Sequence, residues 1–347
     1  MILHVYFGDA LKHPIVQNYL RAGSVRPQAV LRYRLVRSKL LRVALLSLAM
    51  IQARVRQPAV IVQAHDFVSA MLATVLWGRR SIFDSHEIYS CLVRRRTVAW
   101  LVNRVERWVA TRAGCVIYPS AERRDYYGSL KGSRPVVIEN LYRPYAEALT
   151  GEDVRELGRL EAVVKATGQA RYIYAGTMTE VRAIPEIVRA FDRPELRGHH
   201  LFLAGPRTAL LDSILSVERE NVAYLGEVRH AVMTALLPTF DAGFAIYKPS
   251  DANNRLAAPT KLFEYSYYGL AVIANRSTYV ERVKSRDSLA NVSFIEEISS
   301  EEIARKCLSG TGVARASRDQ WRNRVLWQLQ QPVIESMYQD VERLSRK

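Results

Sequence analysis

The chain has 347 residues, of which 49% are hydrophobic and 24% charged, an ordinary composition for a soluble globular protein long enough to form two domains. It contains no long uncharged apolar run, which argues against a membrane-spanning helix, and its three scattered cysteines argue against a disulfide framework. Residues 1–150 hold 23 Lys and Arg against 9 Asp and Glu, a net charge of +14 out of a total of +16. A cationic half indicates a polyanionic partner such as a membrane surface, a nucleic acid or an acidic glycan.

Short apolar runs alternate with helical patterns along the whole chain. In the first half we expect strands at 3–7, 60–63, 81–83, 116–118 and 136–139. The helical patterns between them fall at roughly 28–56, 67–78, 97–112 and 120–128. A second series has strands at 171–175, 200–204, 222–225, 242–246, 270–274 and 292–295. Strands that alternate with helices predict parallel sheets covered on both faces, and therefore an α/β fold with two doubly wound domains.

The two series define the expected domains. We expect an N-terminal domain over residues 1–150, a linker over 151–168 and a C-terminal domain over 169–317. The linker is placed there because the sequence around it lacks a strand pattern. Residues 318–347 follow as a terminal helix with a kink at Pro332, since proline cannot continue the hydrogen bonding of a helix interior.

The most informative segment covers residues 259–275. A short helix is expected to begin at Thr260 and to stop at Gly269, directly before a buried strand. Glycine is favoured just past a helix end because it adopts the left-handed conformation at little cost. The helix N-terminus would therefore lie at the carboxyl end of a sheet, where its backbone N–H groups can bind an anion.

A carboxylate follows this helix start by one turn. Lys261 and Leu262 lie in the first turn, and Glu264 comes directly after it. A carboxylate beside an anion site suits a ligand that carries both phosphates and a pair of hydroxyls, as a nucleoside diphosphate does. The alternative is an ordinary helix–strand unit in which Glu264 is a solvated surface charge.

The segment is also similar to a known family signature. Residues 261–265, Lys-Leu-Phe-Glu-Tyr, with Gly-Leu at 269–270 and Val-Ile at 272–273, resemble the donor site of glycosyltransferase family 4 and its GT-B relatives. The resemblance implies two Rossmann-like domains facing a cleft, with a nucleoside-diphosphate sugar as donor. It also implies that the terminal helix over 318–347 crosses back onto the N-terminal domain. It places Glu264 on the ribose hydroxyls and assigns the diphosphate to the backbone of Thr260, Lys261 and Leu262 and the loop before them.

Further candidate donor residues lie in the turns after the preceding strands. Gly176 follows a strand directly and lets a ligand approach the backbone, and Arg182 can grip a phosphate with two N–H groups. A solvated surface charge is the alternative for Arg182. By resemblance, Gly205 and Tyr224 lie near the nucleotide, although Tyr224 suits a core position equally well.

This chain departs from the family pattern at two positions. Thr177 stands where the family has a basic residue, so that Lys261, with Lys248 as a weaker candidate, would have to compensate. Leu256 stands where family 4 enzymes commonly have a second glutamate that touches the transferred sugar. No Asp-x-Asp pair occurs, and we therefore expect neither a metal nor a cofactor besides the donor, with phosphate charge offset by helix dipole and basic side chains.

Residues 81–88, Ser-Ile-Phe-Asp-Ser-His-Glu-Ile, read as a strand that runs into a polar loop. Ligands of open α/β sheets bind at the carboxyl ends of strands, where Asp84, His86 and Glu87 would lie. The alternative is a loop histidine with Asp84 capping a turn. By resemblance, His86 contacts the donor sugar, and either acid orients the acceptor or accepts its proton.

Two segments concentrate the cations of the first half. Residues 32–56 place Arg and Lys at both ends of an apolar centre, and residues 93–112 combine six arginines with Trp100 and Trp108. Such cationic amphipathic segments can lie in the interface of an anionic bilayer. Alternatively the apolar centre packs on the sheet while its ends are solvated, and both can hold together. Nucleic acid is the rival partner, but no nucleic-acid-binding module is recognisable.

These observations predict a two-domain GT-B glycosyltransferase at the cytoplasmic face of the cell membrane. It would move a hexose from a nucleoside-diphosphate sugar to a glycan or lipid-linked acceptor, with retention, in bacterial polysaccharide or lipopolysaccharide assembly. One alternative is a non-catalytic basic protein that binds membranes or polyanions and keeps a degenerate nucleotide pocket, which Leu256 and Thr177 favour. The other is a GT-B-like sugar-nucleotide epimerase, which the basic first half disfavours.

Overall fold

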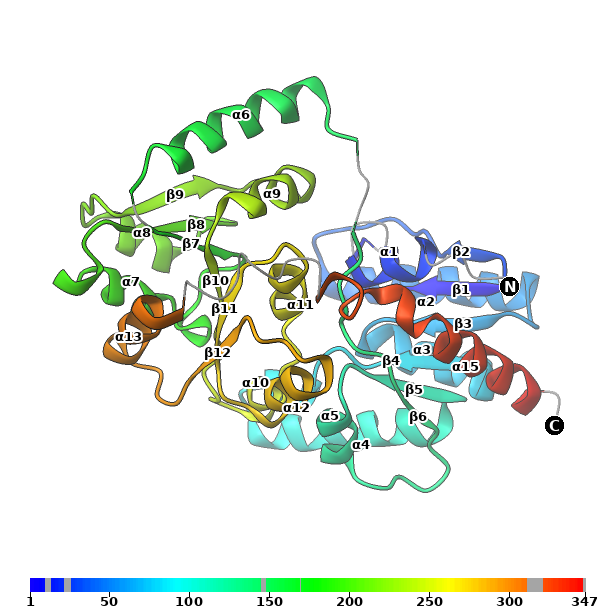
Figure 1. Cartoon of the computed structure of the whole chain (residues 1–347). Coiled ribbons are helices and arrows are strands. Elements are labelled where there is room, and N and C mark those ends of the chain that lie inside the picture. Colours follow the sequence, from blue (N-terminus) through cyan, green and yellow to red (C-terminus); the bar gives the residue numbers. More distant parts are fainter. Residues whose placement is uncertain (10–13, 22–25, 145–147, 169, 311–320, 346–347) are drawn as a thin grey trace. The chain divides into compact units, whose positions relative to one another are not determined.

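The computed structural model describes residues 1–9, 14–21, 26–144, 148–168, 170–310 and 321–345 (Figure 1). The chain divides into two compact units. Unit 1 comprises Met1–Asn140 and Trp327–Lys347, and unit 2 comprises Leu141–Leu326. Each unit is built on one six-stranded sheet, and the strand pairings in both sheets are parallel. The predicted α/β fold with two doubly wound domains is confirmed.

The sheet of unit 1 has the strand order β2-β1-β3-β4-β5-β6. Four of its strands are buried along their whole length, as expected for parallel strands covered on both faces. The strands are β1 (Ile2–Val5), β2 (Gln28–Val30), β3 (Ile61–Ala64), β4 (Ser81–Asp84), β5 (Cys115–Tyr118) and β6 (Pro135–Val137).

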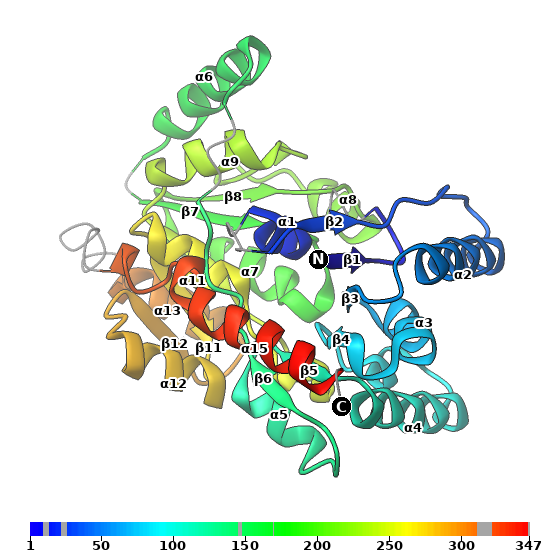
Figure 2. The same cartoon turned by 90° about the vertical axis from the view of Figure 1, so that its right-hand side faces the viewer.

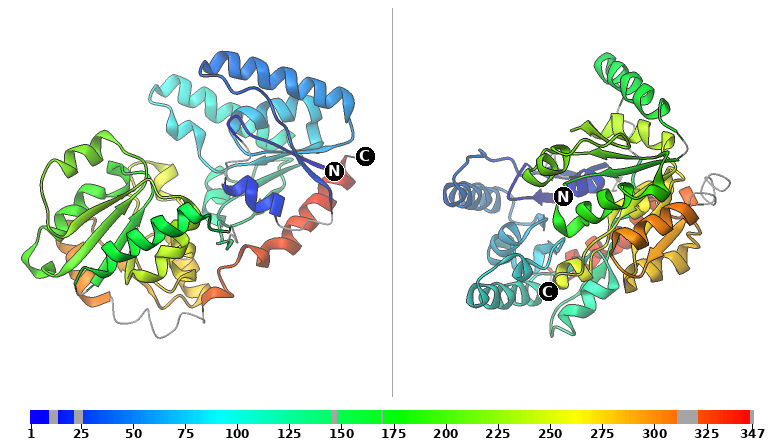
Figure 3. Two further views of the ribbon diagram at one scale, coloured as in Figure 1. Left: turned by 90° about the horizontal axis from the view of Figure 1, so that it is seen from above. Right: turned by 90° about the vertical axis from the view of Figure 1, so that its left-hand side faces the viewer.

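Helices cover both faces of this sheet (Figures 2 and 3). On one face α3 (Phe67–Trp77) lies between α2 (Lys39–Arg56) and α4 (Arg96–Arg112). The other face packs against α1 (Pro14–Arg21) and α15 (Gln331–Leu344), which contribute Tyr19, Ile334, Met337, Tyr338 and Val341 to its apolar core. Helix α5 (Ala121–Tyr127) connects β5 to β6.

The sheet of unit 2 has the order β12-β11-β10-β7-β8-β9. Its strands are β7 (Ala170–Ala175), β8 (His199–Ala204), β9 (Val222–Gly226), β10 (Ala242–Ala245), β11 (Ala271–Asn275) and β12 (Val292–Ile295). Successive residues of β7 alternate between two apolar cores, one on each face of the sheet. The helices are α6 (Gly151–Lys165), α7 (Ile184–Phe191), α8 (Ala209–Leu215), α9 (His230–Leu236), α10 (Ala252–Arg255), α11 (Thr260–Tyr267), α12 (Thr278–Asp287) and α13 (Ser300–Gly310).

The structure differs from the sequence-based expectation in its connecting segments. The helix expected over 28–56 begins only at Lys39, because Ser38 caps it through the Leu41 amide at 3.4 Å and residues 28–30 form the edge strand β2. Pro332 does not kink a long helix but lies in the first turn of α15, where a missing N–H costs nothing. The expected linker contains helix α6, which belongs to unit 2. The expected boundaries at 169 and 317 lie outside the described residues.

A close contact in the core of unit 2 yields a test of the packing. Gly243 of β10 faces the buried ring of Tyr265, and a Cβ at this position would lie 2.5 Å from two ring carbons. Gly243→Ala should therefore lower the free energy of unfolding by about 1–3 kcal/mol, measured by urea unfolding. The matched control is Gly158→Ala in α6, where an added Cβ meets no atom within 4 Å. It should stabilise by about 0.5–1 kcal/mol, and equal stability of Gly243→Ala and wild type would contradict the packing.

Candidate functional site

Glycines stand at the carboxyl ends of three neighbouring strands in unit 2. The N–H of Gly176, after β7, donates to the Ala204 carbonyl at 2.7 Å, and the N–H of Gly205, after β8, donates to the Gly226 carbonyl at 2.9 Å. Gly205 has a φ of 145°, and a Cβ on it would lie 2.2 Å from the carbonyl oxygen of Gly176. Only glycine permits this approach, so the strand ends form a tightly stacked backbone surface without side chains.

The first turn of α11 brings a cation onto this surface. A Cβ on Gly176 would lie 2.9 Å from the Lys261 ammonium, which also lies 5.5 Å from the centre of the Tyr174 ring. Burial lowers the pKa of Lys261, the Glu264 carboxylate raises it, and the charge of Arg182 lowers it again. Thr260 begins the helix as an exposed residue, whereas the Leu262 side chain is fully buried in the core, so only the backbone of Leu262 can serve a ligand.

Arg182 supplies a second cation beside Lys261. It ends the short 3₁₀ turn Glu180–Arg182, and its guanidinium carbon lies 3.6 Å from the centre of the Tyr247 ring. Its Nη1 is buried and makes no hydrogen bond with any described residue. Lys248, by contrast, lies 3.0 Å from a Glu186 carboxylate oxygen, so its charge is already offset. A buried guanidinium nitrogen with no protein acceptor favours an external anion at Arg182.

Glu264 and Tyr224 complete the predicted donor residues. The Glu264 carboxylate, one turn into α11, lies 3.1 Å from Nε2 of His230, the first residue of α9. Its side chain is largely buried but retains 16% exposure. The Tyr224 hydroxyl donates to the Gly205 carbonyl at 2.7 Å and thereby braces one of the glycine turns. His230 was not predicted, because its contact with Glu264 depends on how α9 and α11 pack.

In unit 1 the structure brings Asp84 and His86 together. Asp84 ends β4 and is 2% exposed, with its Oδ1 3.6 Å from His86 Nε2. His86 is half-buried, and its carbonyl accepts a hydrogen bond from Arg123. The third candidate, Glu87, is half-buried, and its backbone carbonyl accepts a hydrogen bond from the Ser85 hydroxyl at 3.3 Å.

His65, which lies directly after β3, was not predicted from the sequence. Its Nδ1 is 3.0 Å from Asp84 Oδ2, and the nearest ligand atoms of His65, Asp84 and His86 lie within 4.8 Å of one another, close enough to share a metal ion. Asp84 Oδ2 also accepts a hydrogen bond from Gln63 Nε2 at 3.2 Å, so this oxygen already has a protein donor. The available signal was a pair of polar residues, Gln63 and His65, within and directly after a strand buried on both faces.

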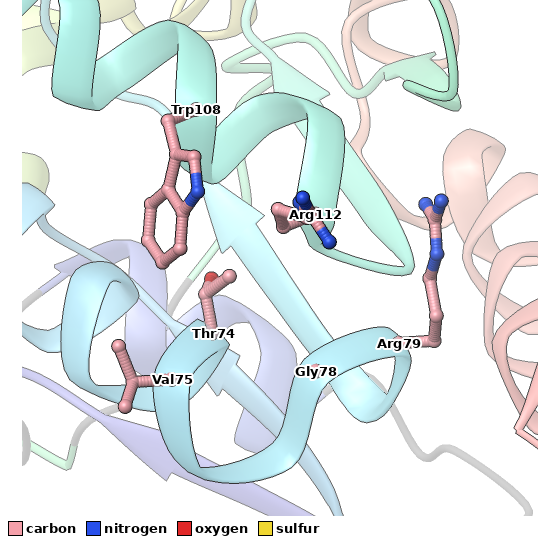
Figure 4. A pocket seen from close by; sticks show the side chains of 6 residues that line it. All are labelled: Thr74, Val75, Gly78, Arg79, Trp108 and Arg112. Atoms are coloured by element: carbon pink, nitrogen blue, oxygen red, sulfur yellow. The ribbon is translucent and has the colours of Figure 1, made fainter.

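A second feature of unit 1 is the outer surface of helices α2 and α4. The apolar residues of α2 that remain exposed recur at helical spacing and include Leu41, Leu48, Ile51 and Val55. On α4 the exposed residues include Trp100, Leu101 and Trp108. Figure 4 shows Trp108 and Arg112 of α4 beside Thr74 and Val75 of α3, at an open pocket also lined by Gly78 and Arg79. Among the described residues, no helix is both long and apolar enough to cross a membrane.

No protein-family model and no curated protein matches the chain. Solved structures do. Sucrose-phosphate synthase from Thermosynechococcus elongatus aligns with a TM-score of 0.69 at 13% identity over 99% of this chain and 100% of that one. HepE of Anabaena, in complex with UDP-glucose, aligns with a TM-score of 0.66 at 15% identity over 100% of both chains.

A third similar structure is WaaG, a glycosyltransferase involved in lipopolysaccharide biosynthesis, with a TM-score of 0.56 at 11% identity over 100% of this chain and 95% of that one. At such low identities the similarity establishes the fold. The chain has the GT-B fold of these glycosyltransferases, with one Rossmann-like sheet in each unit. The GT-B fold that the sequence resemblance implied is confirmed.

Proposed function

We propose that the protein is a glycosyltransferase that moves a sugar from a nucleoside-diphosphate sugar to a glycan or lipid-linked acceptor. The observation that carries the proposal is the pair of cations, Arg182 and Lys261, at the stacked glycine turns of unit 2. The buried Arg182 Nη1 has no acceptor among the described residues, and an anionic ligand would supply one. HepE, which shares the fold, was solved with UDP-glucose and with UDP.

A nucleoside-diphosphate ligand accounts for the presence of two cations and the Glu264 carboxylate in unit 2. Lys261 and Arg182 offset the charge of the diphosphate, which grows as the glycosidic bond breaks, so their interaction strengthens in the transition state. The N-terminal amides of α11 add to this, because the helix dipole favours negative charge there. Glu264 binds the ribose hydroxyls. The nucleotide contacts the protein backbone at the glycine turns. The donor site needs no metal in this arrangement.

Unit 1 supplies the acceptor half of the chemistry in this proposal. His86 contacts the transferred sugar, Asp84 holds His86 from the sheet side, and Asp84 or Glu87 takes the acceptor proton. Retention of configuration, a hexose as the transferred sugar and a role in polysaccharide or lipopolysaccharide assembly belong to the same proposal. A binding protein without turnover is the second candidate, favoured by Thr177, which is exposed where a cation would complete the clamp.

The assignment of Glu264 to the ribose can be tested by replacing its carboxylate with an amide. Glu264→Gln keeps the shape but removes the charged acceptor, and it should weaken binding of the preferred nucleoside diphosphate by about 1.5–3 kcal/mol, roughly 10- to 100-fold in Kd. Titration calorimetry with UDP, ADP and GDP measures this. The matched control is Glu281→Gln on α12, which should bind as wild type does. If the two variants bind equally, Glu264 does not hold the ribose.

A nucleotide that binds without transfer would separate the two candidates. In that case incubation of the protein with a radiolabelled nucleotide sugar and lipid-linked acceptors yields no product, whereas Glu264→Gln still loses affinity. That outcome favours the non-catalytic protein with a nucleotide pocket. Product formation that is lost in Asp84→Asn and in His86→Gln favours the transferase.

We also propose that the outer surface of α2 and α4 docks on an anionic membrane, at the cytoplasmic face of the cell membrane. Neither α2 nor α3 contains an acidic residue. The one acid of α4, Glu106, is fully buried and accepts hydrogen bonds from the amides of Tyr89 and Ser90. The surface is thus cationic and partly apolar, with the Arg104 guanidinium 4.9 Å from the centre of the exposed Trp100 ring. Such a surface matches the interface of a bilayer with anionic lipids.

Vesicle binding should depend on these cations. Arg37, Lys39 and Arg104 are exposed, and replacing all three by Gln should weaken binding to vesicles with anionic lipid roughly 100-fold, since each cation near the surface contributes about 1 kcal/mol. Co-sedimentation at rising salt measures this, because salt screens the attraction. The control replaces three exposed arginines of unit 2 by Gln and should bind normally: Arg189, Arg207 and Arg305.

Two results would contradict membrane docking. Binding that is indifferent to lipid charge and to salt would exclude the electrostatic account. Binding to RNA or DNA that is tighter than binding to vesicles, and that the same three substitutions abolish, would assign the surface to nucleic acid instead.

A further inference from the structure

A row of buried polar residues crosses the sheet of unit 1 beneath α1 and α15. The inward face of its central strands begins with isoleucine, at Ile2, Ile61 and Ile82, all in the apolar core of that face. Two residues further along, the same face carries His4, Gln63 and Asp84, which are 0%, 0% and 2% exposed. The register pairs His4 with Gln63, and Ala64 with Phe83, so that His65 comes beside Asp84. Buried polar side chains of this kind require hydrogen-bond partners.

One arm of the row runs from the terminal helix to Asp84. The hydroxyl of Tyr338, a fully buried residue of α15, donates to Gln63 Oε1 at 2.6 Å. Gln63 Nε2 in turn donates to Asp84 Oδ2 at 3.2 Å. The ionised Asp84 carboxylate only accepts hydrogen bonds, so the Gln63 amide turns its N–H groups toward Asp84 and its oxygen toward the Tyr338 hydroxyl.

The second arm runs through two histidines. His4 Nε2 lies 3.1 Å from Gln28 Oε1, an atom that only accepts, so His4 carries its proton on Nε2. His4 Nδ1 is then the acceptor for His65 Nε2 at 2.9 Å, and His65 Nδ1 lies 3.0 Å from Asp84 Oδ2. Burial, together with the charge of His65, lowers the pKa of His4 to about 3, which keeps His4 neutral.

We infer that Tyr338 and Gln63 are positioning residues for the Asp84–His86 pair. Gln63 and His65 both engage Oδ2 of Asp84, which leaves Oδ1 directed at His86 Nε2. The negative charge of the carboxylate, 3.6 Å from His86 Nε2, favours the protonated form of the imidazole. This inference rests on the proposed function only in that His86 is taken as the residue that meets the substrate. Through Tyr338, the returning terminal helix becomes part of the site.

Two groups face His86 from the sheet: the Asp84 carboxylate, with Oδ1 3.6 Å from Nε2, and the His65 ring, which stacks on the His86 ring at 5.9 Å between centroids. Burial raises the pKa of the Cys115 thiol to about 12 and the pKa values of the Tyr19 and Tyr338 hydroxyls well above their ordinary range, so these groups stay neutral. The remaining titratable or charged groups near the pair are Glu87 in the same loop and Arg123 of α5.

The test is the titration of His86 followed by NMR in protein labelled at the histidine Cε1 positions. The chain has seven histidines, and His86→Gln identifies the signal. Tyr338→Phe removes one hydroxyl and should lower the titration midpoint of His86 by about half a pH unit or more, since the carboxylate is no longer held toward it. Gln63→Met should act in the same direction, and Asp84→Asn more strongly. Nucleoside-diphosphate affinity should be unchanged in Tyr338→Phe and in Gln63→Met.

A matched control separates positioning from stability. Tyr172→Phe deletes a buried hydroxyl of unit 2 that donates to the Cys307 carbonyl at 2.8 Å, so it loses a comparable bond but should leave the His86 titration unchanged. If Tyr338→Phe and Gln63→Met also leave that titration unchanged, the inference is overturned. It is equally overturned if ZnCl₂ alone binds one ion per chain and His65→Gln and His86→Gln abolish this binding, because Asp84 is then a metal ligand.

The outcome is independent of whether transfer is observed. If no sugar transfer is detected but the His86 midpoint shifts in Tyr338→Phe, the positioning role stands while the proposed function falls. If transfer is detected and the midpoint does not move, the proposed function stands while the positioning role falls.

Discussion

The close approach of two backbone turns is the constraint on which the proposed donor half-site depends. Gly205 can follow β8 only because it has no Cβ, since that atom would lie 2.2 Å from the Gly176 carbonyl oxygen. The stacked turns present a surface without side chains at the carboxyl ends of the strands, where ligands of α/β sheets bind. The Lys261 ammonium is adjacent to this surface, and Arg182 stands beside Lys261. The site therefore combines backbone access with concentrated positive charge.

Unit 1 is also built on a parallel sheet, but the carboxyl ends of its strands carry buried polar side chains instead of glycine turns. Its central strands give up apolar packing at their carboxyl ends and bury His4, Gln63 and Asp84 instead. A carboxylate buried without partners would be costly, and Asp84 accepts a hydrogen bond from Gln63 of β3, which in turn accepts one from Tyr338 of α15. The His65 ring also lies 3.0 Å from the carboxylate. The terminal helix thus does more than cover an apolar face. It completes a hydrogen-bonded network that ends at Asp84, 3.6 Å from His86.

The fold and half of the site were predictable from local patterns. Buried apolar strands and helix starts such as Thr260 show a pattern in consecutive residues. The carboxyl ends of neighbouring parallel strands lie at the same edge of a sheet. Gly176 and Lys261 could therefore be assigned to one candidate site. The edge strand β2 was missed because its three residues are only half-buried and show no strand pattern. His65 and His230 were missed because their contacts depend on strand register and helix packing, which no local pattern carries.

The central claim is that unit 2 binds a nucleoside diphosphate through Arg182 and Lys261. Thermal unfolding of the whole protein with UDP, ADP and GDP, and with the matching monophosphates and nucleosides, tests it most directly. A ligand present at 100 times its Kd adds about 2.7 kcal/mol of stability, so at least one diphosphate should raise the midpoint, its monophosphate far less, and Arg182→Ala with Lys261→Ala should abolish the effect. If no diphosphate shifts the midpoint, or if the double variant responds as wild type does, the account is contradicted.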